Sequence, residues 1–376
     1  MILPAAAGAL IILTVLWEAF EVVVLPRRVA RRFRFTRLFY RITWFPWRAI
    51  GRRISRTRRR EGFLSIYGPL SLLVLFSVWA ALLVLGFGLI YFADRRLHLG
   101  GPQFETSVYL SGTTFFTLGL GDVQPHSSLE RIFVVAESGL GFGFLALVLS
   151  YLPVIYQAFS RREVNIVLLD ARAGSPPTAA ELLRRHTGPH GLDALQQLLR
   201  DWERWSAEIL ESHISYPVVS YFRSQHNNES WLGALAAILD TSAFLIAGAE
   251  NSCTRQARLT FAMCRHTVVD LAQVFLAAPR EGFNRLPPPE MERLFAALAQ
   301  AGIPIHDTPA ARKKLRQLRD MYEPYIEALA AHLNVDLPPW ILAKEISDNW
   351  RTSAWGRITG YSSPALEDSL SDDHAD

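Results

Sequence analysis

TTFFTLGLGDVQP, residues 113–125, carries the most specific structural signal in this chain. The segment Glu105–Phe116 is too short to cross a bilayer, and it predicts a short helix of about three turns. Such a helix enters the membrane and stops partway. Backbone at that depth is tolerated only where it is buried against protein or lines a water-filled space. The stretch therefore predicts a re-entrant loop held between two spanning helices.

The loop after this short helix, TLGLGD at Thr117–Asp122, has glycine at alternate positions. Gly119 and Gly121 reach positive φ at little steric cost, so the backbone can alternate its twist and aim successive carbonyls at one axis. A ring of such carbonyls can replace the hydration oxygens of a cation, and the Thr117 hydroxyl can add a ligand at the inner end. The partly negative C-terminal end of the short helix also favours a cation.

Three apolar segments are long enough to span a hydrocarbon core of about 30 Å. They are Ile2–Leu25, about Ile66–Phe92 and about Leu129–Tyr156. Half of the residues are hydrophobic, but nearly all the long apolar runs lie in the first 157 residues. The first segment lacks a basic stretch before it and is followed by arginines, the reverse of a secretory signal. We expect it to be a retained spanning helix that packs at the periphery.

A basic loop follows the first segment: residues 26–61 hold fourteen arginines and one acid, Glu61. Because basic loops stay in the cytoplasm, we predict an outside N-terminus, a re-entrant loop facing outside and a cytoplasmic C-terminal half. Aromatic residues are interleaved with the arginines, a combination that suits the headgroup level of an anionic membrane. We predict a lipid-facing basic segment containing Arg27, Arg28, Arg31 and Arg32. The alternative is a solvated orientation signal, and tethering between two spans argues against nucleic-acid binding.

The TLGLGD loop resembles the TVGYGD signature of potassium channels that have two spans around one pore loop. Leucine at the aromatic position also resembles the second pore loop of animal two-pore-domain potassium channels. The resemblance covers about residues 65–157. It implies passive conduction, with K⁺ as the permeant ion and no other cofactor, in the cell (plasma or inner) membrane. One pore loop per chain implies a homotetramer. The ion would bind at Thr117, Leu118, Gly119 and Leu120, and Asp122 would help to set the charge of the outer mouth.

Leu120 departs from the family pattern, because leucine cannot make the hydrogen bond with which a tyrosine braces the filter. This departure keeps a weakly selective cation channel open as an alternative. A membrane-anchored helical scaffold with a decayed pore is another alternative. Retention of Thr117, both filter glycines and Asp122 argues against decay.

Glu137 is an ionisable residue inside the third span, where such groups usually serve function. We predict that it faces the pore helix, hydrogen-bonds near Tyr109, Thr113 or Thr114, and supports the filter. The alternative is a glutamate at the outer helix end, near water. Some relatives carry a buried acid at the position of Thr113, and this chain lacks it.

Three glycines follow in the same span, Gly139, Gly141 and Gly143. Small residues let membrane helices pack closely. Gly141 also sits nineteen residues after Asp122, where the family's inner helix usually has a hinge. Packing and a gating hinge are both kept as interpretations.

We therefore predict an all-α membrane protein with three transmembrane helices, a re-entrant pore helix and a filter per subunit, and an α-helical cytoplasmic domain. The predicted segments are a spanning helix (1–25), a basic interfacial segment (26–64), a pore domain (65–157), a linker (158–177), a helical domain (178–360) and a disordered acidic tail (361–376). Helices of the cytoplasmic part are expected at 178–186, 191–211, 214–225, 229–248, 252–277, 288–301, 309–332 and 338–350.

The cytoplasmic part offers no chemistry that identifies a ligand. Residues 232–248 form a largely apolar run of 17 residues with one acid, Asp240, and we expect a buried core helix rather than a fourth span. Cys253 and Cys264 would lie about 16 Å apart along one helix, too far for a disulfide, so we expect buried thiols in a reducing compartment. Neither zinc-ligand spacing nor a nucleophile–base constellation occurs, so no enzyme is predicted and the cytoplasmic ligand stays unassigned.

Overall fold

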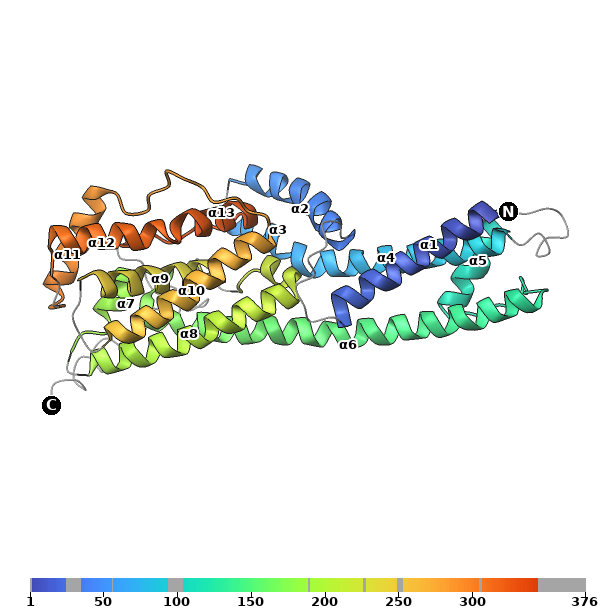
Figure 1. Ribbon diagram of the computed structural model, residues 1–376, viewed down its shortest axis with the longest axis horizontal. Coiled ribbons are helices and arrows are strands. Elements are labelled where there is room, and N and C mark those ends of the chain that lie inside the picture. The colour runs from blue at the N-terminus through green and yellow to red at the C-terminus, as the bar shows by residue number, and fades with distance from the viewer. Residues whose placement is uncertain are drawn as a thin grey trace, which may run out of the picture. The chain divides into compact units, whose positions relative to one another are not determined.

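The computed structural model describes residues 2–24, 35–55, 57–93, 104–188, 190–225, 228–248, 253–303 and 306–343 (Figure 1). Among these residues every regular element is helical, which confirms the all-α class. In chain order the elements are α1 (Ile2–Ala19), the π-helical turn η1 (Phe20–Val24), α2 (Phe35–Arg53), α3 (Thr57–Ser65), α4 (Tyr67–Ala93), α5 (Phe104–Phe115), α6 (Ser128–Ala173), α7 (Ala179–Arg184), α8 (Gly191–Ser215), the 3₁₀ turn η3 (Pro217–Tyr221), α9 (Trp231–Gly248), α10 (Thr254–Val274), α11 (Pro288–Gln300), α12 (Pro309–Asp320) and α13 (Glu323–Leu333).

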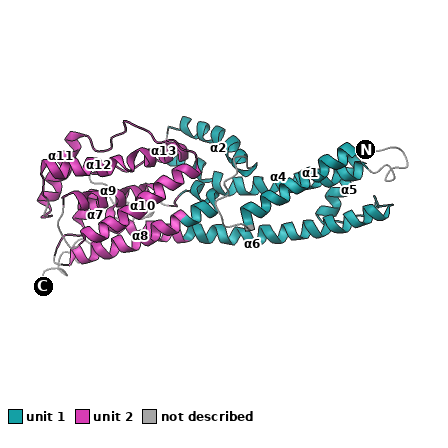
Figure 2. Ribbon diagram, viewed as in Figure 1, with its two compact units in different colours: residues 1–160, 211–223 teal, residues 161–210, 224–376 magenta. Residues whose placement is uncertain are grey.

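The chain divides into two compact units (Figure 2). Unit 1 contains residues 1–160 and 211–223, and unit 2 contains residues 161–210 and 224–376. The boundary therefore does not follow the predicted division of the sequence into a pore domain and a later helical domain. A short segment from the second half of the chain, residues 211–223, belongs to the unit that carries the predicted re-entrant loop.

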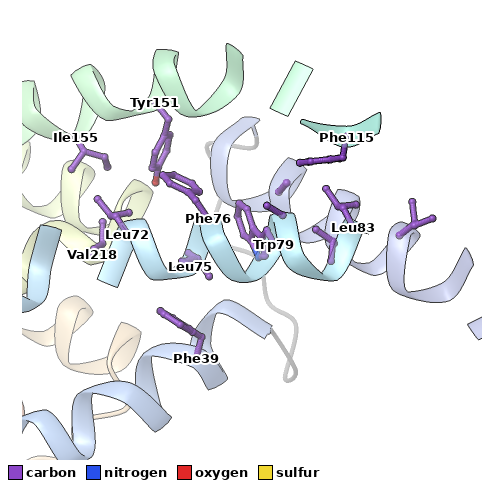
Figure 3. Packing of buried hydrophobic residues seen from close by; sticks show 14 of the residues in the cluster. Phe39, Leu72, Leu75, Phe76, Trp79, Leu83, Phe115, Tyr151, Ile155 and Val218 are labelled. Carbon is purple, nitrogen blue, oxygen red and sulfur yellow. The ribbon is translucent and has the colours of Figure 1, made fainter. Parts of the chain in front are cut away.

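Unit 1 is built around α4, which packs against α1 and α5. Glycines allow α1 and α4 to approach closely, since a Cβ atom on Gly8 would lie 2.4 Å from the Gly86 carbonyl oxygen. This is the small-residue packing typical of membrane helices. Large apolar side chains fill the rest of the core, among them Phe76, Trp79 and Phe115 (Figure 3).

One face of α6 completes this core. Its buried and half-buried positions recur at spacings of four and three residues: Glu137, Gly141, Phe144, Val148, Tyr151 and Ile155. The ring of Phe76 meets Phe144 and Tyr151 edge-on, at centroid distances of 6.5 and 6.0 Å. This periodicity is that of a helix presenting one stripe to its neighbours.

The predicted linker 158–177 is wrong over most of its length, because α6 continues to Ala173. No glycine or proline interrupts residues 158–173, and Ile166, Leu169 and Ala173 are buried, so packing extends the helix. The helix stops at Gly174, whose φ of +80° suits glycine. All four predicted lipid-facing arginines lie outside the described residues: Arg27, Arg28, Arg31 and Arg32. The predicted acidic tail, 361–376, also lies outside them.

The second half of the chain differs from the predicted helix boundaries at three prolines. The predicted helix 214–225 is instead the end of α8 followed by η3, because Pro217 cannot continue the ladder of backbone hydrogen bonds. The predicted helix 309–332 breaks before Pro324 into α12 and α13. Residues 338–343, which begin with Pro338, are irregular, and the rest of that predicted helix lies outside the described residues.

Four helical segments of the described chain are long and apolar enough to cross a membrane: Ile2–Val23, Arg58–Ala93, Ser128–Ala173 and Trp231–Gly248. The last of these, α9, differs from the others because 94% of its apolar window is buried within the protein, against 11% for α6. A helix that is apolar all round and enclosed by protein is a core element. We therefore assign α9 to the core of unit 2 and count three spanning helices.

The two cysteines of unit 2 are buried free thiols, as predicted. Cys253 Sγ donates to the Leu192 carbonyl oxygen, and Cys264 Sγ lies 2.9 Å from Ser206 Oγ. Burial raises the pKa of Cys264 to about 12, so its thiolate is scarce and the thiol is unreactive.

Candidate functional site

The C-terminal end of α5 is tied to the TLGLGD loop by backbone hydrogen bonds. The Leu118 amide donates to the Thr113 carbonyl at 2.8 Å, and the Thr117 amide donates to the Thr114 carbonyl at 3.0 Å. The Gly119 amide also reaches the Thr113 carbonyl, at 3.4 Å. Thr113 and Thr114 thus contact the loop through their main chain, and the last carbonyls of α5 are satisfied by the loop itself.

Residues with positive φ alternate along the loop with residues that do not have positive φ. Thr117, Gly119 and Gly121 have φ values of +56°, +56° and +79°, while the leucines between them do not have positive φ. Alternation of this kind turns successive carbonyls toward the same side of the chain. The two glycines were expected to adopt it. Thr117 was not, because a β-branched residue rarely has positive φ, and its conformation is a strained one of the kind that concentrates at functional sites.

Tyr109 and Asp122 link α5 to the C-terminal end of the loop. The Tyr109 hydroxyl donates to Asp122 Oδ2 at 2.8 Å. Tyr109 was predicted to lie near Glu137, but the hydrogen bond that it makes is to Asp122. The loop is further held by Gln124, whose Nε2 donates to the Gly121 carbonyl at 3.1 Å.

Glu137 is completely buried on α6 and faces α5 and α4. The Tyr91 hydroxyl of α4 donates to its Oε2 at 2.7 Å, and the Ser111 hydroxyl of α5 donates to Oε1. Its partners therefore differ from the predicted Tyr109, Thr113 and Thr114. Ser111 lies two residues before Thr113 and three before Thr114, so it faces another side of α5 than Thr113. Tyr91 lies in a span whose sequence has no apolar periodicity that could indicate its orientation. One carboxyl group on α6 thus bonds to both α4 and α5.

The three glycines of α6 are not equivalent. A Cβ atom on Gly141 would lie 1.9 Å from the Phe115 carbonyl oxygen, whereas Cβ atoms on Gly139 and Gly143 would meet nothing within 4 Å. Gly141 thus allows α6 to touch the last turn of α5, and α6 passes through it unbroken. This geometry favours the packing interpretation at Gly141. Pro153, also inside α6, lacks an amide proton and was not among the predicted hinge residues.

One side of the TLGLGD loop has no protein neighbours within the single chain. Leu118 and Leu120 are 62% and 63% exposed, and Cβ atoms on Gly119 or Gly121 would meet nothing within 4 Å. An exposed apolar stripe runs down the side of α6 that α4 and α5 do not cover; it contains Ile132, Val135, Phe142, Leu145 and Leu149. Such a stripe beside an incomplete loop needs lipid or further protein to cover it.

The basic loop between α1 and α4 is described from residue 35 onward. Glu18, near the end of α1, accepts hydrogen bonds from the Phe35 amide at 2.9 Å and the Thr36 amide at 3.2 Å. A carboxylate at this position caps α2 and complements the positive end of its dipole. The cap ties the first turn of α2 to the end of a spanning helix.

Comparison with known proteins gives two matches. Residues 79–157 match a protein-family model described as "Ion channel". The chain is also 24% identical over 182 residues to "Uncharacterized membrane protein YdjJ" of Bacillus subtilis (strain 168), covering 46% of this chain and 52% of that protein. The chain thus spans about half the length of that relative. No solved structure matches. These matches support a multi-pass membrane protein that carries an ion-channel region.

Proposed function

We propose that this chain is one subunit of a homotetrameric, potassium-selective channel. The proposal rests on the positive φ angles at every second residue, Thr117, Gly119 and Gly121, in the loop that directly follows the C-terminal end of α5. Four such loops around one axis supply rings of carbonyl oxygens that replace the hydration shell of K⁺. K⁺ then binds at the level of residues 117–120 as the transported ion, and Asp122 sets the charge of the outer mouth.

Two exposed apolar surfaces of the single chain support assembly into a tetramer. One side of the loop and the stripe of α6 that contains Ile132, Val135 and Phe142 are apolar and exposed. Neighbouring subunits would cover both and would supply the other three filter segments. The arginines of residues 26–61 support an N-terminus outside and a C-terminal half in the cytoplasm of the cell membrane.

Potassium selectivity is tested with the purified full-length protein in planar bilayers under opposing potassium and sodium gradients. The expected reversal potential lies near the potassium equilibrium potential. A value midway between the two equilibrium potentials would instead support a weakly selective cation channel, consistent with the missing tyrosine at Leu120. A protein that forms tetramers but carries no current would support the scaffold alternative and refute conduction.

We further propose that Glu137 braces the filter by holding α4, α5 and α6 together. Glu137→Gln should speed the loss of current during recording and lower the selectivity for potassium over sodium. The amide keeps the size of the side chain, but its NH₂ group replaces one of the two acceptor oxygens, and a buried hydroxyl left without its acceptor costs about 1–3 kcal/mol. Tyr91→Phe, which removes one hydroxyl from the same network, should change the current in the same direction.

The matched control for this network is Tyr156→Phe. Tyr156 is exposed on α6, the helix that carries Glu137, and removal of its hydroxyl group alters no filter contact. Selectivity and current decay of the Tyr156 variant should equal those of the unmodified channel. If Glu137→Gln and Tyr91→Phe behave like this control, Glu137 does not brace the filter.

We also propose that α2 lies on an anionic membrane surface. Leu38, Ile42 and Phe45 form an exposed apolar stripe, and Arg41 and Arg52 are exposed beside it. The Glu18 cap ties the start of α2 to the end of the spanning helix α1. An apolar stripe flanked by arginines suits the boundary between headgroups and acyl chains.

The lipid proposal predicts weaker binding of anionic lipid when the two exposed arginines are neutralised. Arg41→Gln/Arg52→Gln should cost about 2 kcal/mol, since each arginine near the surface contributes about 1 kcal/mol. That loss corresponds to about thirty-fold in affinity. Titration of phosphatidylglycerol into the detergent-solubilised protein measures it. Lys313→Gln/Lys314→Gln removes the same charge from exposed positions of α12 and should leave binding unaltered.

A further inference from the structure

Residues 216–223, here called the wedge, lie in the second half of the sequence but pack inside unit 1. The chain enters unit 1 after Leu210 and returns to unit 2 at Ser224. Four apolar side chains of the wedge are less than a tenth exposed: Val218, Val219, Tyr221 and Phe222. Val218 belongs to the same buried cluster as Leu72 and Ile155 (Figure 3). The wedge is therefore part of the core of the unit that carries the filter.

One side of the wedge packs on α2 and the beginning of α4. The Tyr221 ring stacks on Tyr40 at 5.6 Å and lies 5.0 Å from Trp44 and 5.3 Å from Tyr67, between ring centroids. Gly68 leaves room for Phe222, because a Cβ atom on Gly68 would lie 2.7 Å from Phe222 Cδ2.

The other side of the wedge holds α6 on both sides of Pro153. Tyr216 meets Tyr151 edge-on at 5.8 Å, and Phe222 lies 5.6 Å from Phe159. Because Pro153 has no amide proton, the Leu149 carbonyl lacks its usual helical partner, and the helix is most easily bent there. The wedge thus clamps α6 across the point where its backbone is weakest.

The chain that leads into the wedge is anchored in unit 2. Helix α8 runs without interruption from unit 2 into unit 1. Within unit 2, the Thr260 hydroxyl donates to the Leu199 carbonyl at 2.8 Å, and the Thr267 hydroxyl donates to the Ser206 carbonyl at 3.0 Å. A displacement of unit 2 therefore moves the helix that ends at the wedge.

We propose that the wedge is the element through which unit 2 controls the pore: when unit 2 displaces it, the clamp on α6 across Pro153 is released and the open probability changes. This inference rests on the proposed channel function. It assigns the wedge to gating, so conduction and selectivity should be unaltered when the wedge is disturbed.

The first test perturbs the contact between the wedge and α4 from each side. Gly68→Ala places a methyl group against the Phe222 ring, and Phe222→Ala removes the ring. Gly62→Ala is the matched control, because it also adds a methyl group to a helical glycine of unit 1 but meets nothing within 4 Å. Single-channel recordings of the full-length protein should show open probability changed by about five-fold or more in both wedge variants, the lower end of usual coupling between sites. Unitary conductance and reversal potential should match those of Gly62→Ala.

The second test locks the wedge and covers the case in which those variants fail to assemble. In Gly68→Cys/Phe222→Cys the two side chains can form a disulfide, because a Cβ on Gly68 would lie 3.1 Å from Phe222 Cγ. Both native cysteines are buried, so oxidant should act on the introduced pair. Oxidation should hold the open probability at one value, and reductant should restore its variation. The two single-cysteine variants should be insensitive to oxidant.

The outcomes separate this inference from the proposed function. Absence of current from the unmodified protein would refute channel function itself. Conducting Gly68→Ala and Phe222→Ala channels with open probability within about two-fold of Gly62→Ala would overturn the wedge proposal alone. A locked channel that gates like its reduced form would overturn it as well.

Discussion

Gly141→Ala is expected to disrupt the pore unit, with a loss of about 3 kcal/mol or more of stability per subunit. The added methyl group would lie 1.9 Å from the Phe115 carbonyl oxygen. A backbone carbonyl cannot turn aside as a side chain can, so α6 would have to move away from the last turn of α5. Overpacking of a rigid contact costs about 1–3 kcal/mol and sometimes more. Tetramer retention and thermal unfolding of the detergent-solubilised protein measure the loss.

Gly139→Ala and Gly143→Ala are matched controls on the same helix. Both sites are open in the single chain, and alanine gains up to about 1 kcal/mol of helix propensity over glycine. Their tetramers should be at least as stable as the unmodified one. The hinge interpretation of Gly141 makes the opposite prediction: a stable Gly141→Ala tetramer with altered gating would restore the hinge and remove the packing role.

The spanning helices and the re-entrant loop could be predicted from the sequence because their signals are local. Apolar length identifies a spanning helix, and alternate glycines signal a backbone that changes hand. Position 117 shows the limit of this reasoning. Its φ of +56° is imposed by hydrogen bonds from the loop to the end of α5, and no residue preference predicts that conformation for threonine.

Contacts between distant parts of the chain were not predictable in the same way. Glu137 was expected to face the pore helix, but its partner Tyr91 lies 46 residues away in a helix that is apolar all round. Without periodicity, the sequence of α4 does not indicate which face meets α6. The wedge is a stronger case, because Val218–Phe222 looks like any short apolar run of a helical domain. Only the packing against α4 and α6 reveals its place.

The prediction of a linker at 158–177 was wrong for a related reason. Arg161 and Arg162 mark where an apolar span ends, and the predicted helix ended close to that point. Charged residues end the membrane contact but not the helix, since arginine is a good helix former. Helix α6 continues until Gly174, so the chain passes from unit 1 into unit 2 within one continuous helix.

Removal of the buried carboxylate of α9 should have the largest effect in unit 2. Asp240 is completely buried and accepts two hydrogen bonds from Arg285, at 2.6 and 2.9 Å, and a third from the Tyr322 hydroxyl. Asp240→Ala leaves the Arg285 charge buried without this partner, and we expect a loss of about 3–5 kcal/mol. Urea unfolding of the full-length protein, followed by hydrogen exchange of the α9 amides, measures the change.

Two further variants distinguish the buried network from an ordinary ion pair and test the assignment of α9. Glu292→Ala breaks the exposed pair with Arg312 and should cost less than about 1 kcal/mol. Asp240→Leu/Arg285→Met removes both buried charges and should recover much of the loss, because apolar side chains of similar volume can replace a buried pair. If α9 instead crossed a bilayer, its neighbours would be lipid, and Arg285 would not be its partner. Asp240→Ala would then leave the exchange of unit 2 amides unaltered, which would contradict the placement of α9 in a protein core.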